Sequence, residues 1–106
     1  MAKYLVNVSY TLDGVRGVAK EGGSARREAA SKLIAAAGGD VECFYFAFGS
    51  DDVIVVADLP DNISASALAL TVSASGGART SITPLITPEE IDEAVKMHPD
   101  YRAPGA

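Results

Sequence analysis

The stretch FGSDDVIVVADLPDN, residues 48–62, is the most informative part of the sequence about the fold, because residues typical of a turn, a buried strand and the start of a helix follow one another within it. Gly49-Ser50-Asp51 are residue types that favour a reversal of the chain. The run Val53–Ala57 is apolar and mostly β-branched, which predicts a strand buried on both sides. Pro60 cannot extend that strand, and Asp61 is a good N-cap for a following helix. The stretch therefore predicts a hairpin whose second strand leads directly into a helix.

The other elements follow from this stretch in both directions. Apolar and polar residues alternate in KYLVNVSY, residues 3–10, as they do in a strand with two different faces. Ser24 is expected to cap a helix that ends at Gly38-Gly39, and Thr87-Pro88-Glu89-Glu90 predicts a capping box at the start of the last helix. We expect strands at 3–10, 41–48, 52–59 and 79–86, helices at 24–37, 61–75 and 87–97, and one helical turn at 15–20.

This order of elements predicts the fold class. Strand, helix, strand, strand, helix, strand and helix correspond to an α+β, ferredoxin-like βαββαβ fold with an added C-terminal helix and a four-stranded antiparallel sheet. The length of 106 residues suits one domain, which we expect to span residues 1–97. Residues 98–106 are rich in Pro, Gly and Ala and are interpreted as a loose tail.

The two faces of the sheet predict self-association. In the hairpin we expect Phe48 opposite Val53, Phe46 opposite Val55 and Phe44 opposite Ala57. These side chains, with Val6 and Val8, form an apolar bed for the helices. The other face is too apolar for water; it holds Leu5, Asn7, Ser9, Cys43, Tyr45, Ala47, Ile54, Val56 and Asp58, with either Thr80-Ile82 or Ser81-Thr83 from the last strand. A second copy packed on this face would cover it, so we expect an obligate homodimer.

Charge and cysteine content exclude several classes of protein. A net charge of −5 opposes nucleic-acid binding, which depends on clustered Lys and Arg. The single cysteine, Cys43, allows no intrachain disulfide and gives no metal-ligand spacing, so we interpret it as a small buried residue and expect no metal and no cofactor. Without a signal peptide or a long apolar run, the expected location is the cytoplasm, with no membrane contact.

The chain resembles the GYD domain family, small proteins of the dimeric α+β barrel superfamily, over roughly residues 3–95. The resemblance rests on Tyr4, Thr11-x-x-Gly14, Gly38-Gly39, Phe44-Tyr45, Phe48-Gly49-x-x-Asp52, Pro60-Asp61 and Gly76-x-x-Arg79-Thr80. Two positions depart from the family pattern: Asp51 takes the place of its tyrosine, and Asp58 stands where Glu is expected. The resemblance implies a dimeric barrel but no particular activity, because the superfamily includes monooxygenases, isomerases and ligand-binding domains.

The candidate site residues are polar groups of the sheet. Asn7, Tyr45 and Asp58 are weak candidates for catalysis, in which a buried carboxylate beside a phenol would abstract a proton. Thr11, Tyr45 and Arg79 are candidates for ligand binding. The competing interpretation is that these groups satisfy one another across the dimer interface, most simply by a pair between Arg79 and Asp58 or Asp52.

Three functions remain open from the sequence. The first is binding of a small apolar or aromatic molecule between the sheet and the helices. The second is a cofactor-independent monooxygenase or isomerase, and the third is a structural or regulatory association module. The only histidine, His98, precedes Pro99 at the end of the last helix, where we expect an exposed residue and no general base. A pocket above roughly 300 Å³ would favour the first two functions over the third.

Overall fold

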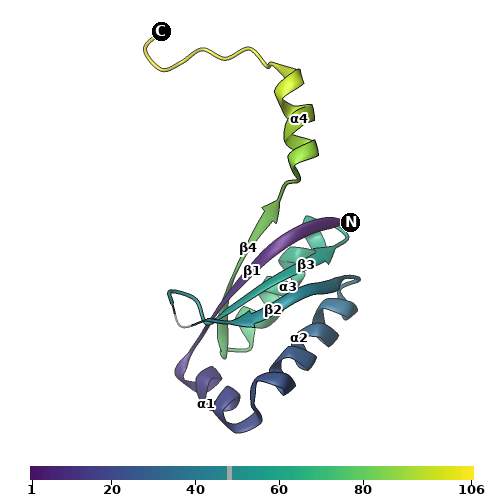
Figure 1. Cartoon of the computed structure of the whole chain (residues 1–106). Coiled ribbons are helices and arrows are strands. Elements are labelled where there is room, and N and C mark those ends of the chain that lie inside the picture. Colours follow the sequence, from purple (N-terminus) through teal and green to yellow (C-terminus); the bar gives the residue numbers. More distant parts are fainter. Residues whose placement is uncertain (48) are drawn as a thin grey trace.

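A computed structural model of the chain describes residues 1–47 and 49–106. Four strands form one antiparallel sheet in the order β2-β3-β1-β4, and α2 and α3 pack on one of its faces (Figure 1). This is the α+β, ferredoxin-like βαββαβ fold with an added C-terminal helix that the sequence predicts. The elements are β1 (Ala2–Tyr10), α1 (Leu12–Glu21), α2 (Gly23–Ala36), β2 (Asp40–Phe46), β3 (Val53–Leu59), α3 (Asn62–Ala74), β4 (Ala78–Leu85) and α4 (Pro88–Met97).

The core lies between the sheet and the helices. Alternate residues of β1 and β3 point to this side and are buried, as the period of two requires. Tyr4, at 2% exposed, is the largest of them, and its hydroxyl donates a 2.6 Å hydrogen bond to Oδ1 of Asn62 at the start of α3. The buried cluster consists of Tyr4, Val6, Ile34, Val53, Val55, Ala57, Leu59, Ala65 and Leu68.

The hairpin register differs from the expected one by two residues. Phe46 lies opposite Val53 and Phe44 opposite Val55, whereas the sequence predicted Val55 and Ala57 as their partners. An irregularity in β2 between Val41 and Cys43 absorbs one extra residue. A shift of two leaves Phe44 and Phe46 on the helix side and Cys43 and Tyr45 on the other side, so the apolar pattern of this part of β2 is equally satisfied by both registers. Before the irregularity, Val41 lies opposite Ala57 and packs against the core. The pairing expected of Phe48 lies outside the described residues.

The register of β4 settles which of its residues face the helices. Thr80 and Ile82 lie opposite Val8 and Val6 and share their face. Ser81 and Thr83 therefore lie on the other face of the sheet, which we call the open face. Of the two alternatives that the sequence allowed, the structure selects this one.

The helix boundaries differ from the prediction mainly around α1. The turn expected at 15–20 is a complete ten-residue helix, and Thr11 caps it by accepting from the amide of Gly14. Ser24 was wrong as the cap of α2, because α2 begins at Gly23 and only Gly22, with φ of 87°, separates the two helices. Glycine adopts such a positive φ without strain, so Gly22 allows the chain to change direction sharply between α1 and α2.

The remaining caps agree with the sequence. Asp61 caps α3 through the amide of Ser64 at 2.8 Å. Thr87 and Glu90 form the reciprocal capping box of α4. The pKa values of Asp61 and Glu90 are lowered because each carboxylate accepts a backbone amide hydrogen bond, from Ser64 and from Thr87 respectively.

Helix α4 and the chain after it extend away from the sheet (Figure 1). Every residue from Thr83 to the C-terminus is exposed. We call residues 86–106 the C-terminal arm. Among the described residues, no helix or strand packs extensively against α4, whereas α2 packs on β2 and α3 on β4.

Candidate functional site

One end of the sheet is closed by an interlock between the start of α1 and the turn before β4. The amide of Thr11 donates to the carbonyl of Gly77 at 3.1 Å, and its hydroxyl donates to the carbonyl of Gly76 at 2.9 Å. Gly14 lies so close to this turn that a Cβ there would overlap the carbonyl oxygen of Gly77. Thr11, a candidate ligand-binding residue, is thus used to fix α1 over the sheet.

A cavity of about 450 Å³ lies beneath α1, between the sheet and the helices. We call it the helix-side cavity. The valines of β1 and β3 form its floor, with Phe44 beside them, and small residues of the helices leave the space open. Its lining includes Val6, Val8, Phe44, Val53 and Val55 from the sheet, and Gly14, Gly17, Val18, Ala29, Ala30, Leu33, Leu68 and Val72 from the helices.

Few polar groups line this cavity. Arg26 and Glu21 both line it and form an ion pair at 3.6 Å between the ends of α2 and α1, and both side chains are partly exposed. Thr80 also lines it, and the Thr80 hydroxyl is buried without a hydrogen-bond partner among the described residues. The helix-side cavity is therefore an apolar space with one charged pair at its edge.

A second, polar hollow of about 260 Å³ lies on the open face and includes Asn7, Ser9, Asp51 and Arg79 in its lining. Asn7 Nδ2 donates to Asp51 Oδ2 at 2.7 Å, and Ser9 Oγ donates to Asp51 Oδ1 at 3.1 Å. Asp51 therefore binds the hairpin loop to β1. Arg79 is exposed at the edge of this hollow, so the structure brings two of the candidate residues, Asn7 and Arg79, into one place.

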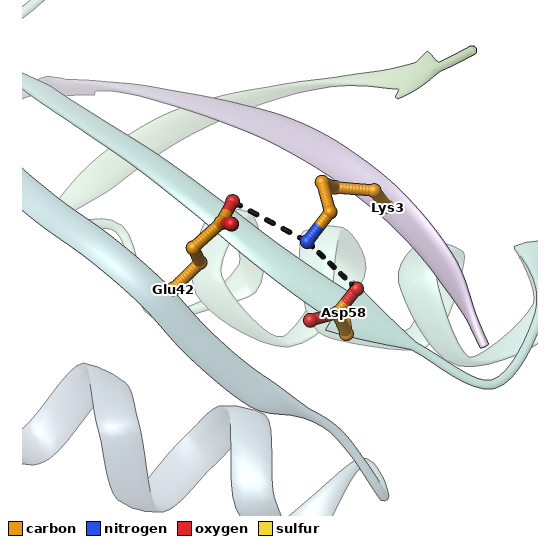
Figure 2. A network of polar contacts seen from close by, with 3 residues as sticks. All are labelled: Lys3, Glu42 and Asp58. Carbon is orange, nitrogen blue, oxygen red and sulfur yellow. Dashed lines mark ion pairs between the residues drawn. The ribbon is translucent and has the colours of Figure 1, made fainter. Parts of the chain in front are cut away.

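Asp58 lies at the opposite end of the open face, where it pairs with a lysine (Figure 2). Lys3 Nζ lies 3.0 Å from Asp58 Oδ1 and 3.3 Å from Glu42 Oε2. The pKa of Lys3 is raised, chiefly by the hydrogen bond to Asp58. Within one chain the expected pair with Arg79 does not form, because Asp58 lies opposite Lys3 and Arg79 opposite Ser9 on β1. Six residues of a strand separate those two rows by about 20 Å.

The other expected partner of Arg79 is also occupied. Asp52 Oδ2 accepts a 2.8 Å hydrogen bond from the amide of Tyr10, and the amide of Asp52 donates to the carbonyl of Val8. Asp51 and Asp52 therefore act together to hold the hairpin loop on the end of β1. The sequence predicted Asp51 as a residue of the turn. In the structure the side chains of both aspartates accept hydrogen bonds from β1, which is distant in the sequence.

Tyr45 and His98 stand apart from these groups. Tyr45 is 68% exposed on the open face, opposite Ile54, with β3 between it and Asn7. His98 is exposed, as expected, and ends α4 in the left-handed conformation at φ of 43°. Asn7, Tyr45 and Asp58 thus share the open face without converging on one point.

Comparison with known protein families shows to which family the chain belongs. The family model of the GYD domain matches residues 4–95. The chain belongs to the GYD domain family. No curated protein matches it. In this GYD domain, the Thr-x-x-Gly and Gly-x-x-Arg-Thr segments meet in the interlock described above, which gives the two motifs a common structural purpose.

Residues 1–47 and 49–106 show neither a membrane-spanning helix nor a cluster of metal ligands. No helix there is both long and apolar enough to span a bilayer. No three His, Cys, Asp or Glu side chains in those ranges lie close enough together to bind one metal ion.

The helix-side cavity contains none of the candidate residues Asn7, Thr11, Tyr45, Asp58 and Arg79. The sequence did hold a signal for it: Gly17 in α1 and an alanine pair in α2. Gly17, Ala29 and Ala30 line the cavity from helices that face the sheet, where a well-filled core would carry larger side chains.

Proposed function

We propose that this GYD domain binds a small apolar or aromatic molecule in the helix-side cavity. Its volume of about 450 Å³ falls within the range of small-molecule pockets, roughly 300–1,000 Å³. The apolar floor of valines would exclude water from such a ligand, and the burial of apolar surface would supply the binding free energy. This volume, kept open by small residues on two helices, is the observation that carries the proposal.

We also infer that two copies pair through the open face as a dimeric α+β barrel. Tyr45 is 68% exposed and Ile54 37% exposed, and Leu5 and Val56 lie beside them on the same face. A sheet face of this composition is stabilised by a second apolar surface. The fold of the GYD family supports the same association.

Binding is better supported than catalysis. A cofactor-independent monooxygenase or isomerase acting through Asn7, Tyr45 and Asp58 needs all three at one substrate, yet Asn7 and Asp58 lie in separate rows of the sheet. Lys3 and Glu42 surround Asp58 with charge in place of the apolar surroundings that raise the pKa of a catalytic carboxyl. An association module without a ligand would need no cavity of this size.

The test is a cavity-filling pair of substitutions read with a fluorescent apolar probe. N-phenyl-1-naphthylamine, which fluoresces when it leaves water, is titrated into the full chain. In the variant Ala29→Leu/Ala30→Leu the added side chains occupy the cavity, so the probe affinity is expected to fall about ten-fold or more. The control Ala35→Leu/Ala36→Leu makes the same change at exposed positions of the same helix and is expected to leave the affinity unchanged.

Two outcomes would refute the proposal. One is absence of saturable probe binding by the unaltered chain. The other is an equal loss of affinity in both variants, with circular dichroism showing that both remain folded.

A further inference from the structure

Helix α4 carries an apolar stripe that none of the residues described by the structure covers. Ile91, Ala94 and Val95 share one side of the helix at the i, i+3, i+4 spacing. Ile91 is 48% exposed and Val95 62% exposed. An isolated helix of ten residues is marginal in water, even with the capping box that starts α4. The arm therefore needs a surface to pack against.

Helix α1 carries the second uncovered stripe. One side of α1 faces the helix-side cavity. On the outward side Leu12, Val15 and Ala19 follow the i, i+3, i+7 spacing, and Leu12 is 65% exposed and Val15 49% exposed. Helix α1 is thus apolar on two sides, and the protein core accounts for only one of them.

The charges beside the two stripes are complementary. The exposed cations Arg16 and Lys20 border the α1 stripe. The carboxylates Glu90 and Asp92 border the α4 stripe, and α4 as a whole carries four acidic residues and one lysine. Opposite charges around matching apolar patches favour one partner and one orientation over others.

The two stripes cannot meet within one chain. Helix α1 follows the Tyr10 end of β1, and α4 leaves β4 beside the Lys3 end, so the length of the sheet lies between them (Figure 1). We propose that the α4 stripe of one copy packs on the α1 stripe of a second copy, so that the C-terminal arm is an exchanged element. The contact closes reciprocally in a twofold pair, or links successive copies if the pair does not close. This proposed contact between α4 and α1 does not depend on ligand binding in the helix-side cavity.

Disulfide trapping tests the contact directly. In a Cys43→Ala background, the single-cysteine variants Ala19→Cys and Ala94→Cys are mixed and oxidised. A disulfide between a residue of each stripe is expected, because side chains in a packed helix pair approach within the Cβ separation of about 3.5–4.5 Å that a disulfide requires. Lys96→Cys, on the opposite side of α4, replaces Ala94→Cys in the matched control and is expected to link far less.

Two results of this trapping would overturn the proposal. The first is equal linkage of Ala19→Cys with Ala94→Cys and with Lys96→Cys, which indicates random collision. The second comes from a chain carrying both Ala19→Cys and Ala94→Cys: a link formed within single chains at high dilution would mean that the arm folds back on its own copy.

A charge reversal gives a second, independent readout. Arg16→Glu/Lys20→Glu places carboxylates beside the acidic α4 stripe, and sedimentation velocity is expected to show about ten-fold or greater weakening of the association that uses the arm. The control Arg27→Glu/Lys32→Glu changes the net charge equally at exposed positions of α2 and is expected to have little effect. Equal weakening by both variants would contradict the proposed contact, since it would reflect net charge alone.

The same measurement applies to the apolar part of the contact. Ile91→Asp/Val95→Asp places charges on the α4 stripe, outside the core, so the domain is expected to stay folded while the association weakens. Glu90 is left unchanged in these variants because it completes the capping box. An unaltered sedimentation coefficient in this variant would refute the proposal.

Discussion

Gly14→Ala is expected to destabilise the fold strongly, although it adds only one methyl group. The new Cβ would overlap the carbonyl oxygen of Gly77 and come within 3.0 Å of its carbon. Forced overpacking costs about 1–3 kcal/mol. Separating the backbones also weakens the two hydrogen bonds from Thr11 to the glycine turn, at about 0.5–1.5 kcal/mol each. The expected loss in the free energy of unfolding is about 2–6 kcal/mol, a large part of the total of about 5–15 kcal/mol for a small domain.

Gly17→Ala in the same helix is the matched control. Its Cβ would meet nothing closer than Glu21 Oε1 at 3.9 Å, and alanine favours the helix by about 0.5–1 kcal/mol over glycine. Urea unfolding followed by circular dichroism, at one protein concentration, measures both variants. Opposite signs for the two substitutions are the expected result. A Gly14→Ala chain that unfolds at the same urea concentration as the unaltered chain would refute the interlock as a rigid contact.

Two further perturbations test single hydrogen bonds. Tyr4→Phe removes the buried hydroxyl that donates to Asn62. Chemical unfolding is expected to show a free energy of unfolding that is lower by about 1 kcal/mol. An unchanged free energy of unfolding would mean that this hydrogen bond adds nothing to stability. Asp61→Ala removes the α3 cap, whose carboxylate has a pKa below the ordinary 3.8. A lowered pKa adds stability that is present above the unfolded value and lost as pH falls through the folded value. The variant is therefore expected to have a lower free energy of unfolding than the unaltered chain at pH 7, and this difference should narrow below about pH 4. A difference of constant size in urea titrations across that range would contradict a contribution from the charged cap.

The order of strands and helices was predictable because each element carries its own local signal. These signals are local in the sequence, since each depends only on residues a few positions away. They include the alternation in β1, the capping residues Asp61 and Thr87, and the glycine at position 38. The hairpin register was not predictable, because no local sequence signal determines it. It depends on an irregularity at Glu42 and on side-chain contacts from the loop to β1, and both belong to residues distant in sequence.

The candidate site was harder to predict than the fold. Polar residues of the sheet drew attention because polar groups on an apolar face need partners. The structure gives Asn7 and Asp58 such partners within the chain, Asp51 for the first and Lys3 for the second. The signal for the cavity is ambiguous, because a helix face of Gly and Ala predicts close packing as readily as an empty space.

The helix-side cavity and the proposed self-association use opposite faces of one four-stranded sheet. Val55 of β3 belongs to the floor of the cavity, whereas its neighbours Ile54 and Val56 point to the open face. Because successive residues of a strand alternate between faces, one apolar strand can supply both surfaces at once. The aspartates at its two ends follow from the same arrangement. In the proposed pair, β3 would be covered on both faces and could carry charge only near its ends, and there Asp52 accepts a hydrogen bond from the amide of Tyr10 while Asp58 pairs with Lys3.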